Sequence, residues 1–517
     1  MDNLTESVSS ATLSSLFQRA FRVYSERVAV TSEEGSWTYR ELGERAKDLA
    51  EALYGIGIRK GDRVAILSET RPEYIETYAA LASLGVTALT LNIRLHAAEI
   101  RYCVESAKPV AVLTSGSLTH LVDGLKNSSS IIHWVCFDET AEGYLYYGKL
   151  LEESYDQIPQ VEVYADDIHN VLYTSGTTGR PKGAMISQGA AAVRGLRVAQ
   201  WFGLGTQDGI VGWAPLFHCL GDESLYATML TGGTYATLRR ADVEMMFKMI
   251  ERDRLSWIPL LPGVLTDFLN HPRRGEFDLS SLRFAAGYAN MSPRLVKELT
   301  ATLGISFWDA FGQTETSYLV AFGEVRPGAE PSLRKTPCPL MEVRIVDPDM
   351  TEAAIGKPGE CVVRGPSVMT GYLDDPEASA EAFRGGWLHT GDVLVRHDDG
   401  TLSYIDRQKY LVKTGGENVY PAEVEAVIAE MESVQEVCVF GVPDDRWGET
   451  VKAVVVLRPG KSTSPAEVAA WCRDRLAGYK RPHYIQFVTA QDLPRSTTGK
   501  LQRHLLAAMP PGPDEAI

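Results

Sequence analysis

The residues best suited to chemistry form a run that reads Tyr-Thr-Ser-Gly-Thr-Thr-Gly-Arg-Pro-Lys-Gly over residues 173–183. Every residue from Thr174 to Gly179 is a glycine or carries a hydroxyl, and Lys182 adds a positive charge. Glycines let backbone N–H groups come close to a phosphate, and hydroxyls supply donors that can reorient. The run therefore predicts a phosphate-binding loop, with the candidate residues Thr174, Ser175, Gly176, Thr177, Thr178, Gly179 and Lys182.

This loop is not a Walker A motif, because Pro181 stands where that motif requires its second glycine. The Thr-Gly-Lys run at 498–500 also fails, since Pro494 takes the place of the first glycine. A flexible surface loop is the alternative for residues 173–183, and the dense string of glycines and hydroxyls makes it the weaker interpretation.

Further clusters place polar side chains beside glycine. They are Phe311–Glu315, Trp387–Asp392, Asp406–Lys409 with Lys413–Asn418, and Pro494–Leu501. Taken alone, each also has an ordinary structural explanation, such as packing for the first and a solvated lysine for the last. Asp392 follows a turn, where it could accept hydrogen bonds from ribose hydroxyls or simply face water.

Length and composition restrict the classes of protein. A chain of 517 residues and 56.8 kDa is too long for one hydrophobic core, so several structural units are expected. The net charge of −16 disfavours general binding to nucleic acid or to an anionic membrane. A phosphate ligand is still compatible with this charge, since backbone N–H groups and a few lysines hold it locally.

Cysteine usage and the apolar segments indicate a cytoplasmic protein. The seven cysteines are scattered without a CxxC pair, which disfavours disulfides and zinc. The N-terminus lacks the basic start and apolar stretch of a signal peptide. The most apolar segment, 79–91, is interrupted by polar residues and is too short to span a bilayer, so we expect no stable membrane insertion.

The elements that position these motifs follow an α/β pattern up to about residue 310. Short apolar runs alternate with helical segments, which implies mostly parallel sheets covered by helices. One helix is predicted between Thr38 and Gly55, because Thr38 and Glu41 have the spacing of a capping box.

The pattern changes after about residue 340. Several strand-like runs predict a smaller β-rich subdomain, in which Asp398-Asp399-Gly400 signals a hairpin. Beyond residue 410 the chain reads as an α+β unit, with one helix that begins at Pro421 and another that Ser464 caps with Glu467.

In order and spacing, these motifs resemble the adenylate-forming superfamily, over about residues 15 to 505. Segments such as Met369–Tyr372 and Gly415–Pro421 are most similar to the acyl-CoA synthetase branch. The resemblance implies an N-terminal domain over 1–407, with two helix-covered sheets and a distorted β-barrel subdomain at about 325–407. A mobile α+β domain would follow over 408–517, with a hinge at Lys409.

The resemblance also implies a reaction. A carboxylic acid would attack the α-phosphate of ATP to give an acyl-adenylate and pyrophosphate, and the thiol of coenzyme A would then displace AMP. Glu315 would hold Mg²⁺, and Thr314 would contact phosphate. The remaining nucleotide contacts implied by the resemblance, beside the phosphate loop, are Gly287, Phe311, Gly312, Asp392 and Arg407. Phe311 would stack on adenine, where relatives often have tyrosine.

Lys500 matches the catalytic lysine of the superfamily. Its charge would offset the repulsion between the carboxylate and the α-phosphate. Rotation about Lys409 would then remove Lys500 and bring Gly415 and Gly416 to a tunnel for the pantetheine arm. Further CoA contacts implied by the resemblance are Arg94, Trp447, Tyr479 and Arg481, although a core position for Trp447 is equally compatible with the sequence.

The acid is less well defined. His218 matches an aromatic–histidine gate of the superfamily, and the absence of an aspartate there disfavours an α-amino acid. Small residues at Gly287, Ala289 and Gly312 suggest space for a bulky hydrophobic acid, either aromatic, polycyclic, terpenoid or of medium to long chain. The sequence leaves the oligomeric state open, a homodimer included.

Several alternatives remain at this point. The acyl-adenylate could be passed to a carrier protein or a partner enzyme, or oxidised as in luciferases. His218 and Asp222 also have the HxxxD spacing of CoA-dependent acyltransferases, which need no ATP. A non-enzymatic scaffold is disfavoured, because the motif residues are all present. The chain departs from the pattern of the superfamily at Lys335, where relatives usually have a glycine. This difference predicts an altered surface turn.

Overall fold

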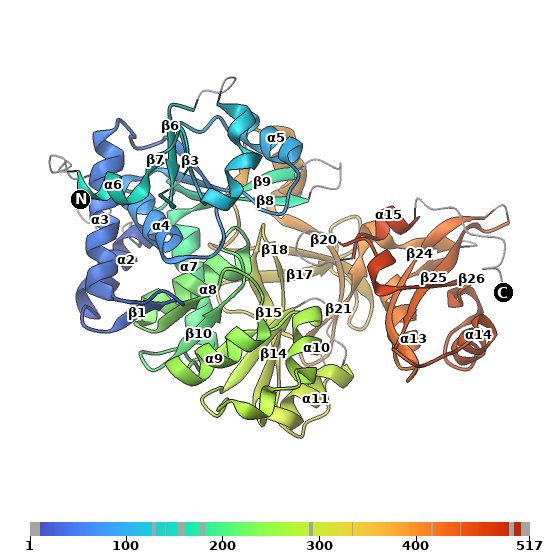
Figure 1. Ribbon diagram of the computed structural model, residues 1–517. Coiled ribbons are helices and arrows are strands. Elements are labelled where there is room, and N and C mark those ends of the chain that lie inside the picture. Colours follow the sequence, from blue (N-terminus) through green and yellow to red (C-terminus); the bar gives the residue numbers. More distant parts are fainter. Residues whose placement is uncertain are drawn as a thin grey trace. The chain divides into compact units, whose positions relative to one another are not determined.

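The computed structural model (Figure 1) describes residues 11–126, 131–139, 141–153, 161–175, 181–288, 293–332, 334–414, 417–444, 446–495 and 501–507. The chain forms two compact units. The first comprises residues 1–342 and 363–388, and the second comprises 343–362 and 389–517. The sequence predicts a different division, with a hinge at Lys409 between residues 1–407 and a mobile domain of residues 408–517. That division stays a prediction.

The first unit contains an eight-stranded and a nine-stranded sheet, both mostly parallel. In spatial order the eight-stranded sheet holds β19 (Gly371–Tyr372), β9 (Pro181–Ser187), β8 (Ile168–Ser175), β4 (Thr87–Thr90), β3 (Arg63–Leu67), β5 (Ala111–Thr114), β6 (His133–Cys136) and β7 (Leu145–Tyr146). The nine-stranded sheet holds β16 (Thr336–Pro337), β15 (Ser317–Val325), β14 (Ser306–Gln313), β13 (Phe284–Tyr288), β12 (Trp257–Pro259), β10 (Gly209–Gly212), β11 (Thr234–Thr237), β1 (Val28–Thr31) and β2 (Ser36–Thr38).

Helices cover these sheets and join them. They are α2 (Leu13–Val23), α3 (Tyr39–Gly55), α4 (Pro72–Leu84), α5 (Ala97–Ala107), α6 (Tyr147–Glu152), α7 (Gln188–Trp201), α8 (Cys219–Thr231), α9 (Val243–Asp253), α10 (Pro262–Asn270), α11 (Pro293–Leu303) and α12 (Pro376–Ala382). Helix α7 contacts β8 and β9 of one sheet and β15 of the other, and it packs along α8. The two sheets are therefore connected through α7 and α8.

Local sequence signals explain where α3 begins and which face it buries. The Thr38 side chain accepts a hydrogen bond from the Glu41 N–H, and the Glu41 carboxylate accepts one from the Thr38 N–H. Leu42, Leu49 and Leu53 are fully buried on one face. Burial of each such side chain contributes about 1.5–3 kcal/mol. The predicted helix and its capping box are confirmed.

A core of the first unit lies against the nine-stranded sheet. Strands β10 to β14 pack there against α9, α10 and α11. Phe247 of α9 and Phe268 of α10 meet edge-on with ring centroids 4.8 Å apart, and Phe307 of β14 belongs to the same core.

The second unit combines a four-stranded sheet with a small α+β part. The sheet order is β17 (Glu342–Val346), β18 (Pro358–Arg364), β20 (Leu388–Arg396) and β21 (Leu402–Arg407). Arg396 pairs with Leu402 across the turn, so the hairpin predicted at Asp398-Asp399-Gly400 is confirmed. Among the described residues, the order of this sheet begins at β17 and ends at β21. It is the β-rich part that the sequence predicts after about residue 340.

The α+β part holds β22 (Val412–Thr414), β23 (Glu417–Val419), β24 (Val434–Asp444), β25 (Gly448–Leu457), β26 (Tyr484–Val488), α13 (Pro421–Ala429), α14 (Pro465–Arg473) and α15 (Arg503–Ala507). As predicted, α13 begins at Pro421, and α14 is capped by Ser464 with Glu467. Among the residues that the structure describes, no helix combines the length and the apolar character needed to cross a bilayer.

Candidate active site

The predicted phosphate loop connects two paired strands of the eight-stranded sheet. Strand β8 ends at Ser175, and β9 begins at Pro181. Thr174 lies opposite Lys182, and its Oγ1 donates to the Lys182 carbonyl over 3.5 Å. Because β8 runs parallel to β4, this connection leaves the sheet at the carboxyl edge, where α/β sheets bind ligands. Residues 176–180 and the Ser175 side chain lie outside the described part.

Tyr372 brings two predicted site residues together. The Lys182 ammonium lies 5.2 Å from the centre of the Tyr372 ring, and the Tyr372 hydroxyl donates to Glu315 Oε1 over 2.9 Å. Tyr372 is held by β19, which pairs with β9 next to Lys182. The predicted phosphate-binding lysine and the predicted metal ligand, which come from different sheets, thus share one neighbour.

Tyr372 itself was absent from the residues predicted for the site. It stands only within the segment Met369–Tyr372 that supported the resemblance. The spacing within that segment gives no signal that the ring reaches Glu315, because the contact joins residues 57 positions apart.

The turn after β14 presents Thr314 and Glu315. Gln313 and Thr316 close the turn through backbone and side-chain hydrogen bonds. Phe311 is buried in β14. A Cβ atom on Gly312 would lie 2.2 Å from the Ser317 carbonyl oxygen, so the residue after Phe311 must be glycine for the strands to meet here.

The expectation that the small residues open space for a bulky acid is wrong for the two described glycines. A Cβ atom on Gly287 would lie 2.7 Å from Cζ of Phe307, and one on Gly312 would meet backbone of β15. Both glycines are required by close packing, because protein atoms already occupy the space in which a side chain would grow. Ala289 lies outside the described residues.

His218 begins helix α8 beside the Thr314 turn. Its Nδ1 accepts a hydrogen bond from the Leu220 N–H over 3.3 Å. The neighbouring Cys219 Sγ lies 3.9 Å from Thr314 Oγ1. The structure therefore brings the predicted gate histidine and the predicted phosphate-contacting threonine to the same end of α8.

This geometry disfavours the HxxxD acyltransferase alternative. The Nδ1 atom of His218 is occupied by a backbone N–H of its own helix, so it caps α8 and does not face Asp222 as a partner. Asp222 is buried and accepts a hydrogen bond from the Asn170 side-chain amide over 2.9 Å and one from the Tyr226 hydroxyl.

In the second unit, the two predicted ribose contacts lie side by side. Asp392 on β20 and Arg407 on β21 are register partners, and Arg407 Nε donates to Asp392 Oδ1 over 3.0 Å. The Asp392 side chain is buried. The interpretation of Asp392 as a solvated turn residue is therefore wrong, although its ligand stays a prediction.

The residues predicted to contact CoA differ in their surroundings. Trp447 and Tyr479 are 40% and 41% exposed, so the alternative of a core position for Trp447 is wrong. The Arg481 guanidinium donates to the carbonyl oxygens of Leu476 and Arg473. Arg94 lies at the surface of the first unit.

The remaining predicted site residues lie wholly or partly outside the part of the chain that the structure describes. Gly415, Gly416 and Lys500 lie outside the described residues. Lys409 is part of a short 3₁₀ turn over Gln408–Tyr410, and its side chain is not described. Their predicted roles stay predictions.

The prediction that Lys335 lies in a surface turn is wrong, because this lysine is buried. Its ammonium forms an ion pair with the buried carboxylate of Asp309 on β14. Burial raises the pKa of Asp309, and the charge of Lys335 opposes this rise. The residue that departs from the superfamily pattern thus neutralises a carboxylate on the strand that leads to Phe311 and Glu315.

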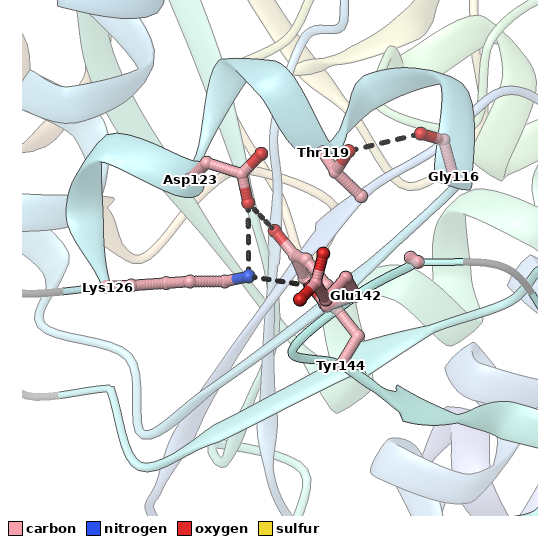
Figure 2. Close-up of a pocket in the computed structure, with 7 residues that line it drawn as sticks. Gly116, Thr119, Asp123, Lys126, Glu142 and Tyr144 are labelled. Carbon is pink, nitrogen blue, oxygen red and sulfur yellow. Dashed lines mark hydrogen bonds and ion pairs between the residues drawn. The ribbon is translucent and has the colours of Figure 1, made fainter.

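A surface depression of about 530 Å³ lies elsewhere on the first unit, between Gly116 and Tyr144. Figure 2 shows that Asp123 pairs with Lys126 over 3.1 Å and accepts a hydrogen bond from the Tyr144 hydroxyl. The residues lining it include none of those predicted for the site. We do not assign it to the active site.

Comparison with known families fits this arrangement. Residues 17–373 match the family described as AMP-binding enzyme, and residues 423–500 match the AMP-binding enzyme C-terminal domain. The chain belongs to the AMP-binding enzyme family. The chain also belongs to the adenylate-forming superfamily, in its acyl-CoA synthetase branch. The enzymes of this branch are AMP-forming acid–thiol ligases.

Relatives of this AMP-binding enzyme are similar over almost their whole length. The indoleacetate–CoA ligase of Aromatoleum aromaticum is 33% identical, over 92% of this chain and 94% of that protein. The solved structure of the anthranilate CoA ligase AuaEII with anthranoyl-AMP has a TM-score of 0.86 at 25% identity, covering 96% of both chains. The amide bond synthetase McbA of Marinactinospora thermotolerans has a TM-score of 0.85 at 28% identity, covering 96% of this chain and 99% of that one.

Proposed function

We propose that this protein is an ATP-dependent acyl-CoA synthetase for a bulky hydrophobic carboxylic acid, with aromatic acids as the first candidates. The acid would form an acyl-adenylate and then a CoA thioester, with release of pyrophosphate and AMP. The observation that carries the proposal is the contact of Tyr372 with both Lys182 and Glu315. The indoleacetate and anthranilate ligases, both named for aromatic acids, support the choice of substrate class.

The first half-reaction requires two anions to approach each other. A carboxylate oxygen attacks the α-phosphorus of ATP, and pyrophosphate leaves with the electrons of the broken P–O bond. We assign Lys182 and the Thr174–Gly179 loop to the β- and γ-phosphates. Lys500 stabilises the charge that develops between carboxylate and α-phosphate. Phe311 supplies a stacking face for adenine, and Asp392 accepts from the ribose hydroxyls.

Glu315 fits a magnesium ion. Its carboxylate is a hard oxygen donor of the kind that Mg²⁺ prefers, and the Tyr372 hydroxyl orients one of its two oxygens. When bound, the ion neutralises part of the triphosphate charge. Thr314, the preceding residue, adds a hydroxyl for a phosphate oxygen.

The second half-reaction uses the C-terminal part of the chain. The CoA sulfur attacks the acyl carbon, and AMP leaves with the oxygen that bridged carbon and phosphorus. We propose that residues 408–517 turn about Lys409 between the two half-reactions, and that Gly415 and Gly416 line the path of the pantetheine arm. Trp447 and Tyr479 present exposed rings to the nucleotide end of CoA. Arg481 and Arg94 stay the candidates for its phosphates.

Asp392→Ala is expected to raise the KM for ATP about 10- to 100-fold, because charge-assisted hydrogen bonds to ribose contribute about 1.5–3 kcal/mol. Acid-dependent pyrophosphate exchange at varied ATP measures this. Asp399→Ala, in the exposed hairpin turn next to the same strands, is the control and is expected to keep the wild-type KM. An unchanged KM in Asp392→Ala would remove this residue from the nucleotide site.

Trp447→Ala is expected to raise the KM for CoA about tenfold, since stacking of a base on an aromatic ring contributes about 1–3 kcal/mol. Acyl-adenylate formation is expected to stay at the wild-type rate, because ATP does not use this ring. Tyr164→Ala removes an aromatic ring of similar exposure in the first unit and serves as the control. If both variants bind CoA as the wild type does, the assignment of Trp447 fails.

A panel of acids tests the proposed function. Pyrophosphate release is measured with aromatic, polycyclic, medium-chain and long-chain acids, with and without CoA. The proposal expects acid-dependent release that CoA stimulates, with an acyl-CoA product and with aromatic acids at the top of the ranking. Thioester formation without ATP, or no acid-dependent release across the panel, would overturn it.

A second candidate function is transfer of the acyl group to a different acceptor. The amide bond synthetase McbA is as similar in structure as the CoA ligase, so membership of the family alone does not fix the acceptor. Arg481 also has its guanidinium bound to backbone carbonyls, which leaves fewer donors for a CoA phosphate. Acid-dependent release without CoA stimulation, followed by transfer to an amine or a pantetheinylated carrier protein, would select this alternative.

A further inference from the structure

Helix α7 carries an arginine whose charge is completely buried. The Arg194 side chain is 1% exposed, and its donors reach three separate segments. Nε donates to the Ser367 carbonyl over 2.8 Å, and Nη1 donates to Glu223 of α8 over 3.2 Å. Nη2 donates to the Thr314 carbonyl over 3.1 Å. One planar guanidinium therefore ties α7 to α8, to the 365–369 loop and to the turn that bears Glu315.

The partner of Arg194 holds the other side of the same turn. Glu223 is fully buried, and its Oε2 accepts a hydrogen bond from the Ser317 hydroxyl over 2.5 Å. Arg194 thus fixes the residue before Glu315, and Glu223 fixes a residue shortly after it.

Ser317 needs such a restraint because its backbone is strained. Its φ angle is +96°, in a region that side chains other than glycine rarely adopt. Conformations of this kind cost about 1–3 kcal/mol and persist only where the surroundings enforce them, often at functional sites. The hydrogen bond to Glu223 and the close approach of Gly312 to the Ser317 carbonyl are the enforcing contacts.

The 365–369 loop completes the support of Glu315. The Met369 N–H donates to the Glu315 carbonyl over 2.8 Å, and the Ser367 hydroxyl donates to the Thr316 carbonyl over 3.1 Å. The same loop leads to Tyr372, which binds the Glu315 carboxylate. Backbone and side chain of Glu315 are thus both held by segments that Arg194 connects.

Stability alone does not account for this ion pair. Replacing a buried ion pair with well-packed apolar residues is often neutral or stabilising. A lysine could supply the charge but not the fixed fork that reaches three acceptors at once. We propose that the Arg194–Glu223 pair is a positioning device that sets the Thr314–Glu315 turn for Mg²⁺ and ATP, an inference that rests on the proposed function.

Arg194→Lys tests this, because it keeps the charge and loses the fork. Acyl-adenylate formation is expected to fall about 10- to 100-fold, the usual effect of losing a group that orients a metal ligand. The Mg²⁺ concentration for half-maximal rate is expected to rise severalfold. Conversion of supplied acyl-adenylate and CoA to thioester is expected to stay near the wild-type rate.

The matched control is Arg71→Lys. Arg71 is also a buried arginine of the first unit, 4% exposed, and its guanidinium donates to Glu73 over 2.8 Å and to Asp138 over 3.1 Å. Neither partner belongs to the Glu315 turn or to the 365–369 loop, so its replacement is expected to leave the Mg²⁺ requirement at the wild-type value. Ser317→Gly covers the case in which Arg194→Lys does not fold: glycine accepts the positive φ, the tether to Glu223 is lost, and the Mg²⁺ requirement is expected to rise.

The outcomes separate this inference from the proposed function. A wild-type protein that forms no acyl-adenylate with Mg²⁺ and ATP contradicts the proposed function. If the wild type is active, two results overturn the positioning role. One is a wild-type Mg²⁺ requirement in folded Arg194→Lys or Ser317→Gly. The other is an equal rise of the Mg²⁺ requirement in Arg71→Lys.

Discussion

Lys500→Ala is expected to form acyl-adenylate at least about 100-fold more slowly than the wild type, and to convert supplied acyl-adenylate to thioester at nearly the wild-type rate. The large loss follows because one ammonium group offsets the repulsion of two anions in the first half-reaction, and donors to developing charge are worth about 10²–10³ in rate. In the second half-reaction the thiol attacks the acyl carbon and AMP, a good leaving group, departs with the bridging oxygen. No carboxylate has to approach the α-phosphate in this step, so the charge of Lys500 is not expected to be needed. Acid-dependent pyrophosphate release and thioester formation from acyl-adenylate are measured separately.

Lys461→Ala is the control for the Lys500 experiment. Lys461 lies at the surface of the same unit and pairs with Glu432 over 2.7 Å. Its removal is expected to leave both rates unchanged, since exposed pairs contribute little. If Lys500→Ala slows both half-reactions equally, the two do not use different arrangements of the C-terminal part. The account of alternation about Lys409 would then be wrong.

Lys335→Met is expected to lower the unfolding free energy of the first unit by about 3–5 kcal/mol, the usual cost of leaving a buried charge without its partner. The loss is expected to grow with pH. Burial already raises the pKa of Asp309, and removal of the opposing Lys335 charge raises it further. Because the folded state then binds the proton more tightly than the unfolded state, stability falls as pH rises from about 4 through the folded-state pKa. Urea unfolding at pH 5 and pH 8 measures both effects.

Two further variants control the Lys335 experiment. Lys335→Met with Asp309→Leu removes both charges and is expected to recover most of the loss. Lys297→Met breaks the exposed pair with Glu330 and is expected to cost less than about 1 kcal/mol at either pH. A loss in Lys335→Met that matches Lys297→Met, or that does not change with pH, would show that Asp309 does not depend on Lys335.

Local signals in the sequence were sufficient to predict where many helices and turns begin. The capping box of Thr38 and Glu41, the turn at Asp398-Asp399-Gly400 and the helix start at Pro421 depend on residues within one turn of each other. Each works through neighbouring backbone groups, so the rest of the fold does not alter it. The alternation of apolar runs and helices likewise predicts parallel sheets, which the structure confirms.

The contacts that complete the site join distant residues, and the sequence could not indicate them. The sequence predicts Lys335 as a surface residue, because nothing in it shows that Asp309 on β14 is the partner of this lysine. Gly287 and Gly312 suggest open space, whereas Phe307 and the β15 backbone fill that space. Tyr372 and Arg194 act on the Glu315 turn from far along the chain. Residue type shows what a side chain can bind, but only the packing shows which partner it has.

If the acid is activated as proposed, one of its carboxylate oxygens becomes bonded to the α-phosphorus of ATP. The best acid of the panel, labelled with ¹⁸O in its carboxylate, is incubated with the protein, ATP, Mg²⁺ and CoA. AMP is expected to acquire one labelled oxygen for each acyl-CoA formed, as measured by mass spectrometry. Unlabelled AMP, or a label that appears in inorganic phosphate beside ADP, would contradict this activation.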